Sequence, residues 1–237
     1  MARKTFISYK YSESCEYRDK IIRSLGDDAT YYTGETADSP DISNLKVESI
    51  KNHLKDMIFN TTVTMVILSP SLTESKWVDW EIEYSLSKYS RDGKTSSING
   101  LIGIVPPFYG DYSWFISTHS NPDGHETNNY INEEARTFRI MYENRYNQNP
   151  KEYACPRCKS VDQLTGSYLS YVKLDDFCID PDKYIENAYE KSQHVNSYDL
   201  RRKMVVPEKL RTLDHGRPWR DDQFASTRLS SSRDMSR

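Results

Sequence analysis

The chain has 237 residues with 32 Lys or Arg, 35 Asp or Glu and a formal net charge of −3. Residues 200–237 hold 10 basic and 5 acidic side chains, so the remaining body is acidic, which disfavours binding to nucleic acid. Apolar runs stay below the roughly 18 residues that span a bilayer, and the N-terminus lacks the apolar segment of a secretory signal. We therefore expect a cytoplasmic protein without membrane partners.

Apolar runs alternate with helix-like segments along the chain, as in a parallel sheet with crossover helices. The predicted strands are 4–9, 29–33, 62–68, 98–105 and 168–175. The predicted helices are 16–25, 47–59, 76–90 and 181–192. Residues 106–166 break the alternation and are expected to form an insertion with one helix at about 131–146. We predict an α/β fold of five mainly parallel strands with helices on both faces over residues 1–199, and a basic flexible tail over 200–237.

In such a fold, ligands bind outside the carboxyl ends of the strands, where the loops after the first three strands meet. The usual phosphate-binding motifs G-x-G-x-x-G and G-x-x-x-x-G-K-[ST] are missing, which disfavours a standard dehydrogenase or P-loop NTPase. A phosphoacceptor receiver needs acidic side chains after its first and third strands to hold a metal ion and phosphate. This chain has Ser8-Tyr9-Lys10 and Ser69-Pro70 at those positions, which disfavours a receiver domain.

The segment W-V-D-W-E-I, residues 77–82, raises a functional question. At about 100° per residue, Val78, Ile82 and Leu86 cover the sheet, while Glu81 shares a flank with Trp77. Glu81 is then either a site residue facing the crevice or an acid favoured by the helix dipole beside a core tryptophan. Spacing leaves both interpretations open.

Three ordered motifs resemble those of the Toll/interleukin-1 receptor (TIR) superfamily, and of its bacterial ThsB sensors from the Thoeris anti-phage system. They are K-T-F-I-S-Y-K at 4–10, N-T-T-V-T-M-V-I-L at 60–68 and S-P-S-L-T-E-S-K-W-V-D-W-E-I at 69–82. The resemblance covers residues 3–105 well and implies a flavodoxin-like TIR fold. The loop 34–44 lies where TIR domains carry a second motif, which this sequence does not match.

The resemblance implies an enzyme that cleaves the bond between nicotinamide and ribose of NAD, which is its substrate rather than a cofactor. It implies that Glu81 is catalytic and that Phe6, Ser8, Tyr9 and Trp77 bind substrate. ThsB-like activity further implies a cyclic ADP-ribose isomer, a phage-derived trigger and a separate effector that reads the diffusible product, with a homo-oligomer left open. A plain NAD glycohydrolase toxin and a non-catalytic TIR-like interaction module are the alternatives.

The cysteines Cys15, Cys155, Cys158 and Cys178 are too scattered for a disulfide framework, so we expect free thiols. Cys155-Pro-Arg-Cys158 has the spacing of half a zinc site, but Pro181 stands where a second C-x-x-C from Cys178 would end. The histidines also lack an H-x-x-x-H spacing. The sequence therefore predicts no metal.

Overall fold

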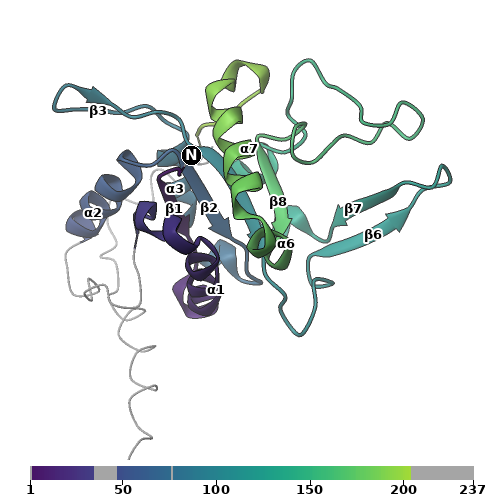
Figure 1. The fold of residues 1–237 in the computed structure, drawn as a ribbon, viewed down its shortest axis with the longest axis horizontal. Coiled ribbons are helices and arrows are strands. Elements are labelled where there is room, and N and C mark those ends of the chain that lie inside the picture. Colours follow the sequence, from purple (N-terminus) through teal and green to yellow (C-terminus); the bar gives the residue numbers. More distant parts are fainter. Residues whose placement is uncertain (1, 35–46, 76, 204–237) are drawn as a thin grey trace, which may run out of the picture.

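A computed structural model describes residues 2–34, 47–75 and 77–203 (Figure 1). The helices are α1 (Tyr11–Ser24), α2 (Val47–Phe59), α3 (Val78–Ser85), α4 (Glu133–Arg136), α5 (Arg139–Tyr142), α6 (Leu174–Ile179) and α7 (Pro181–Gln193). Short 3₁₀ turns lie at Gly26–Tyr31, Leu72–Glu74 and Val195–Ser197. The strands are β1 (Thr5–Ser8), β2 (Val63–Ile67), β3 (Ser90–Arg91), β4 (Lys94–Thr95), β5 (Gly100–Val105), β6 (Ile116–Ser120), β7 (Glu126–Tyr130) and β8 (Leu169–Lys173).

The central sheet of the described residues is parallel and has four strands in the order β1-β2-β5-β8. The α/β prediction is confirmed, but the predicted second strand over 29–33 is not a strand of this sheet. Gly26–Tyr31 form the 3₁₀ turn, and Tyr32 makes a single parallel bridge to Thr5. Gly26 turns the chain with φ 55°, and the polar residues after it favour a turn over an extended strand.

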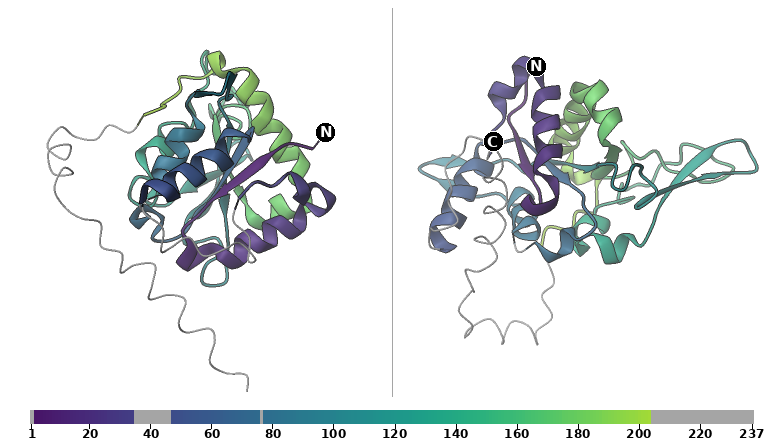
Figure 2. Two further views of the ribbon diagram at one scale, coloured as in Figure 1. Left: turned by 90° about the vertical axis from the view of Figure 1, so that its left-hand side faces the viewer. Right: turned by 90° about the horizontal axis from the view of Figure 1, so that it is seen from below.

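Apolar side chains alternate between the faces of the sheet, as the period of a strand requires. On β2, Met65 and Ile67 pack beneath α1, α6 and α7, whereas Val66 packs beneath α3 and α5. Figures 1 and 2 show α1 and α7 on one face of the sheet. The sheet is therefore buried on both sides, in the doubly wound arrangement that places ligand sites at the strand ends.

The helix α7 lies very close to β5. A Cβ on Gly100 would stand 1.9 Å from the carbonyl oxygen of Ala188 in α7. Only a glycine permits this approach of strand and helix, because any side chain would push the two backbones apart.

The structure corrects two predicted helices. The helix predicted over 76–90 is shorter, since α3 ends at Ser85 and the chain continues into the hairpin of β3 and β4. In place of one helix at about 131–146, α4 and α5 are separated by extended backbone at Thr137 and Phe138. This break lets Ile140 and Met141 of α5 enter the core beneath α3.

The region between β5 and β8 contains a hairpin, β6–β7, that the sequence patterns did not predict. It extends away from the sheet in Figures 1 and 2. Arg145 anchors its base, because the guanidinium pairs with Glu133 at 2.6 Å and lies 4.0 and 4.4 Å from the ring centroids of Tyr130 and Tyr171. The buried cation thus joins the hairpin to the edge strand β8.

The structure does not test the division of the chain at residue 199. The loop predicted at 34–44 and the tail predicted at 200–237 lie largely outside the described residues. Within the described part of the chain, each helix is too short or too polar to cross a membrane.

Candidate functional site

The strand β1 sends its predicted site residues to opposite faces of the sheet. Phe6 lies in a cluster with α2 and α3, and the Ser8 side chain contacts α3. Ile7 and Tyr9 instead pack on the α1 side. This alternation follows from the two-residue period of a strand, so Tyr9 points away from the face that holds Ser8.

Ser8 and Glu81 form the centre of the candidate site. The Ser8 hydroxyl donates a short hydrogen bond to the Glu81 carboxylate, and the exposed fractions of the two residues are 1% and 6%. Ser8 ends β1, and Glu81 lies in the first half of α3. The contact therefore joins a strand end to the third crossover helix at the carboxyl edge of the sheet, where the sequence placed the site.

A buried polar network holds α3 in place behind Glu81. The Ser85 hydroxyl donates to the Glu81 carbonyl at 2.8 Å and lies 2.8 Å from the Thr64 hydroxyl of β2. Asn99 donates side-chain hydrogen bonds to Thr64 and Thr61 at 3.0 and 2.8 Å, and its backbone N–H donates to the Ser85 carbonyl. Such a satisfied network fixes the position of a helix more specifically than apolar contacts do.

Sequence reasoning did not identify this network as support for Glu81. A signal existed in Thr64, a hydroxyl inside an otherwise apolar strand, and in Ser85, which lies one helical turn after Glu81. Each residue is ordinary by itself, and the pairing becomes visible once β2 lies beneath α3.

Charged and hydroxyl side chains connect the loops after β1 and β2. Lys10 donates to Ser71 at 2.6 Å and pairs with Glu74 at 2.7 Å, while the Ser71 hydroxyl donates to Glu13. Burial raises the pKa of Glu13, but the Ser69 and Ser71 hydroxyls and the Lys10 charge outweigh it, so the pKa lies below its usual value. Glu13 is therefore an anion that helps hold the two loops together at neutral pH.

Two of the predicted substrate-binding residues pack in the core on the Glu81 side of the sheet. Phe6 is 2% exposed and belongs to a cluster with Ile50 and Leu54 of α2. Trp77, directly before α3, packs against the same cluster and is partly buried. In this conformation Phe6 has almost no surface for a ligand, whereas Trp77 retains some.

The remaining predicted residue, Tyr9, lies on the α1 side. Its hydroxyl accepts a hydrogen bond from Arg18 at 2.6 Å, and its ring packs near Tyr11. The structure therefore brings together Ser8 and Glu81, with Trp77 and Phe6 nearby in one cluster. It directs the Tyr9 side chain elsewhere.

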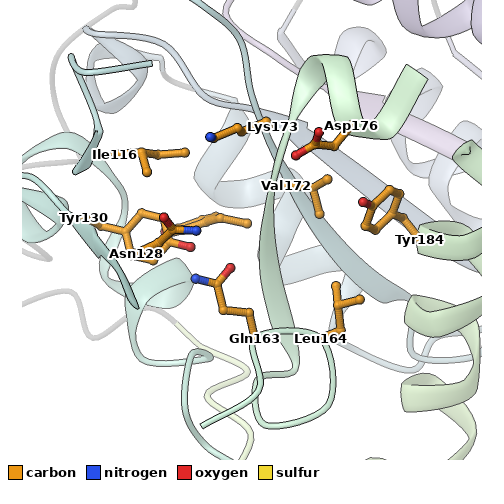
Figure 3. A pocket seen from close by; sticks show the side chains of 10 residues that line it. Ile116, Asn128, Tyr130, Gln163, Leu164, Val172, Lys173, Asp176 and Tyr184 are labelled. Carbon is orange, nitrogen blue, oxygen red and sulfur yellow. The ribbon is translucent and has the colours of Figure 1, made fainter. Parts of the chain in front are cut away.

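A separate pocket of about 190 Å³ lies at the opposite edge of the sheet (Figure 3). Its walls come from the β6–β7 hairpin, the loop before β8, β8 itself, α6 and α7. Figure 3 shows Lys173 and Asp176 at one end and the amide groups of Asn128 and Gln163 near its middle. None of the predicted site residues lines this pocket, which is three strand spacings, roughly 14 Å, from β1.

The part of the chain that contains Ser8 and Glu81 is similar to a known protein family. Residues 6–109 match the family described as Thoeris protein ThsB, TIR-like domain. This segment runs from β1 to the turn after β5 and covers less than half of the 237 residues. Over residues 6–109 the chain is therefore similar to the TIR-like domain of the Thoeris protein ThsB.

Proposed function

We propose that this protein is an anti-phage enzyme that uses Glu81 to cleave the nicotinamide–ribose bond of NAD and makes a cyclic ADP-ribose isomer. The observation that carries the proposal is the buried Ser8–Glu81 contact at the carboxyl edge of the sheet, inside the segment that matches the ThsB TIR-like domain. NAD is the substrate in this proposal, and the protein needs no other cofactor.

The chemistry suits a single buried carboxylate. Nicotinamide leaves as a neutral molecule, because the electron pair of the broken bond to the ribose C1′ neutralises its pyridinium nitrogen. The leaving group needs no proton, so the second carboxylate of an ordinary glycosidase is not required. Glu81 would stabilise the positive charge that develops on the ribose, and its low exposure strengthens this electrostatic effect.

Ser8 has a positioning role in this mechanism. Its hydroxyl donates to a Glu81 carboxylate oxygen and thereby sets the carboxylate orientation. A preorganised carboxylate does not have to reorient as charge develops, which is the main source of electrostatic catalysis.

The fate of the ribosyl cation determines the product. Capture by a hydroxyl of the same molecule, with loss of its proton, gives a cyclic isomer. Capture by water, also with loss of a proton, gives linear ADP-ribose. In the proposed pathway a phage-derived trigger activates the enzyme, and a separate effector binds the cyclic product.

A non-catalytic TIR-like interaction module is the second candidate. The observation that favours it is the packing of Phe6 inside the cluster with α2 and of the partly buried Trp77 against that cluster. A module of this kind would need Glu81 for the stability of α3 at most, and its binding activity would survive substitution by an isosteric amide.

The test is an NAD turnover assay on the full chain with and without lysate from phage-infected cells, with products identified by mass spectrometry. Glu81→Gln keeps an acceptor for Ser8 and should lower nicotinamide release by at least about 100-fold, because the charge is lost. Ser8→Ala should lower it by roughly 10- to 150-fold, the value of a hydrogen bond to a charged group.

Glu83→Gln is the matched control, since it removes a nearby carboxylate of the same helix that lies outside the Ser8 contact. Its turnover should stay within about twofold of the wild type, because this half-buried side chain lies outside the Ser8–Glu81 contact. Turnover by Glu81→Gln at the wild-type rate would refute the proposal. Linear ADP-ribose as the sole product would favour a toxin, and no turnover with any lysate would favour the interaction module.

A further inference from the structure

The tip of the β6–β7 hairpin meets the Cys155-Pro-Arg-Cys158 segment. Ligand atoms of Asp123, His125, Cys155 and Cys158 all lie within 4.8 Å of one another. The first two residues come from the hairpin turn and the second two from a segment about 30 positions later. The fold therefore assembles a group of two thiols, one imidazole and one carboxylate that is not contiguous in sequence.

The separations within this group resemble those of a tetrahedral site. Zinc bonds of about 2.0 Å to nitrogen or oxygen and 2.3 Å to sulfur place neighbouring ligand atoms roughly 3.3 to 3.8 Å apart. Here Cys155 Sγ lies 3.4 Å from Asp123 Oδ2, which lies 3.7 Å from His125 Nδ1. His125 Nδ1 lies 4.0 Å from Cys158 Sγ.

We propose that Asp123, His125, Cys155 and Cys158 bind one Zn²⁺ in a structural site. Two thiolates and an imidazole select a borderline-soft ion such as zinc over Mg²⁺ or Ca²⁺, which prefer oxygen ligands. Four protein ligands fill a tetrahedral shell and leave no position for a reacting water, as in structural rather than catalytic sites. Binding would release the two thiol protons to solvent.

Neighbouring groups orient the ligands. Asp123 accepts a hydrogen bond from the His125 backbone N–H through Oδ1 at 3.2 Å, which directs Oδ2 to Cys155. On the other side, the chain turns back after Cys158, and the Ser160 carbonyl accepts from the Ala154 N–H at 2.9 Å. Contacts of this kind fix the direction of metal ligands in known sites.

The surroundings also explain why a metal would be needed here. The strands of the hairpin are mostly exposed, and an isolated two-stranded hairpin is marginally stable in water. Residues 143–168 contain no regular helix or strand, which is unusual for a connection of this length. A bound ion would join these two weakly packed segments.

The proposed ion would also fix two walls of the pocket in Figure 3. Asn128 and Tyr130 of the hairpin line that pocket from one side, and Gln163 and Leu164 line it from the loop after the Cys155–Cys158 segment. Both segments would be held by the same metal. The shape of the pocket would then depend on zinc, whereas the Ser8–Glu81 contact at the other sheet edge would not.

The experiment measures metal bound to the untagged full chain, purified with a reducing agent and without chelators. The wild type should contain about one zinc per chain, and Co²⁺ added to the metal-free protein should give the visible absorption of thiolate ligands. Cys158→Ser and His125→Ala should weaken zinc binding by more than the roughly 10- to 100-fold typical of changes to groups around the ligands.

Cys178→Ser is the matched control, because Cys178 is a free and partly buried thiol outside the group. It should keep the wild-type zinc content. The proposal would be overturned by wild-type protein that binds no zinc after reconstitution, by a cobalt spectrum without thiolate bands, or by a Cys155–Cys158 disulfide under these reducing conditions. It would equally fail if Cys178→Ser lost as much zinc as Cys158→Ser. None of these measurements depends on NAD turnover, so they test the metal site independently of the enzyme.

Discussion

The buried lysine Lys191 predicts a specific dependence of stability on pH. Lys191 is 4% exposed, and its ammonium donates to the Ser167 carbonyl at 2.9 Å and to the Ser170 hydroxyl at 2.8 Å. Burial lowers its pKa to about 7, against a smaller opposing effect from the Asp162 charge. Neither hydrogen-bond acceptor is charged, so the folded protein pays to keep this side chain protonated.

The direction of the effect follows from the two protonation states. Between the folded pKa of about 7 and the unfolded value of 10.5, the unfolded chain binds a proton that the folded protein releases. The free energy of unfolding therefore rises with pH across this window. Below pH 7 both states are protonated, and the full cost is about 5 kcal/mol. Between pH 6 and pH 9 the same relation gives a gain of about 2.7 kcal/mol.

The assay is urea denaturation of wild type and Lys191→Met at pH 6 and pH 9. Methionine removes the titration while nearly keeping the length of the side chain. The stability of Lys191→Met relative to wild type should be greater at pH 6 than at pH 9 by about 2.7 kcal/mol. Lys183→Met on the exposed face of the same helix is the control and should show no such change. An equal difference at both pH values would refute the reasoning.

Two further substitutions, Arg145→Met and Gly100→Ala, test packing, and Arg139→Met is the exposed control for the first. Arg145→Met should lower the free energy of unfolding by about 3 to 5 kcal/mol, because it leaves the charge of Glu133 unpaired beside the core. Arg139→Met removes the exposed pair with Glu143 and should cost less than about 1 kcal/mol in the same urea titration. Gly100→Ala should cost at least about 2 kcal/mol by calorimetry, because its Cβ would collide with a backbone carbonyl of α7. Wild-type stability of Gly100→Ala would show that the two elements can separate freely.

The alternation of apolar and helical segments was enough to predict the central fold. The strands at 62–68, 98–105 and 168–175 correspond to β2, β5 and β8 because each is a short run of residues that must be buried on both faces. The same pattern cannot distinguish a short strand from a turn when polar residues precede it. For this reason the prediction of a strand over residues 29–33 was wrong.

The insertion was harder to predict because its structure depends on contacts between distant residues. Arg145 is buried among tyrosines of the hairpin and β8, and a sequence window around it indicates only a polar helix. Asp123 and His125, which are grouped with Cys155 and Cys158, likewise come from the hairpin turn, so cysteine spacing by itself predicted no metal. Long-range pairings of this kind leave no local periodicity.

The candidate site was predicted in part. The position of Glu81 at the strand ends followed from the fold and from the TIR resemblance, and the Ser8 contact agrees with it. The grouping of Tyr9 with Ser8 overlooked the period of a strand, since adjacent residues of β1 face opposite sides. The contact of Phe6 and Tyr9 with substrate stays a prediction.

The pairing of β5 with β8 determines which surfaces a fragment limited to the matched segment, residues 6–109, would expose. A fragment ending at residue 109 would leave the outer edge of β5 without its hydrogen-bonding partner and uncover the apolar side chains of Ile102 and Ile104. An open, apolar strand edge is a template for intermolecular association. The residues after 109 therefore cover both a strand edge and an apolar face of the segment that resembles the ThsB TIR-like domain.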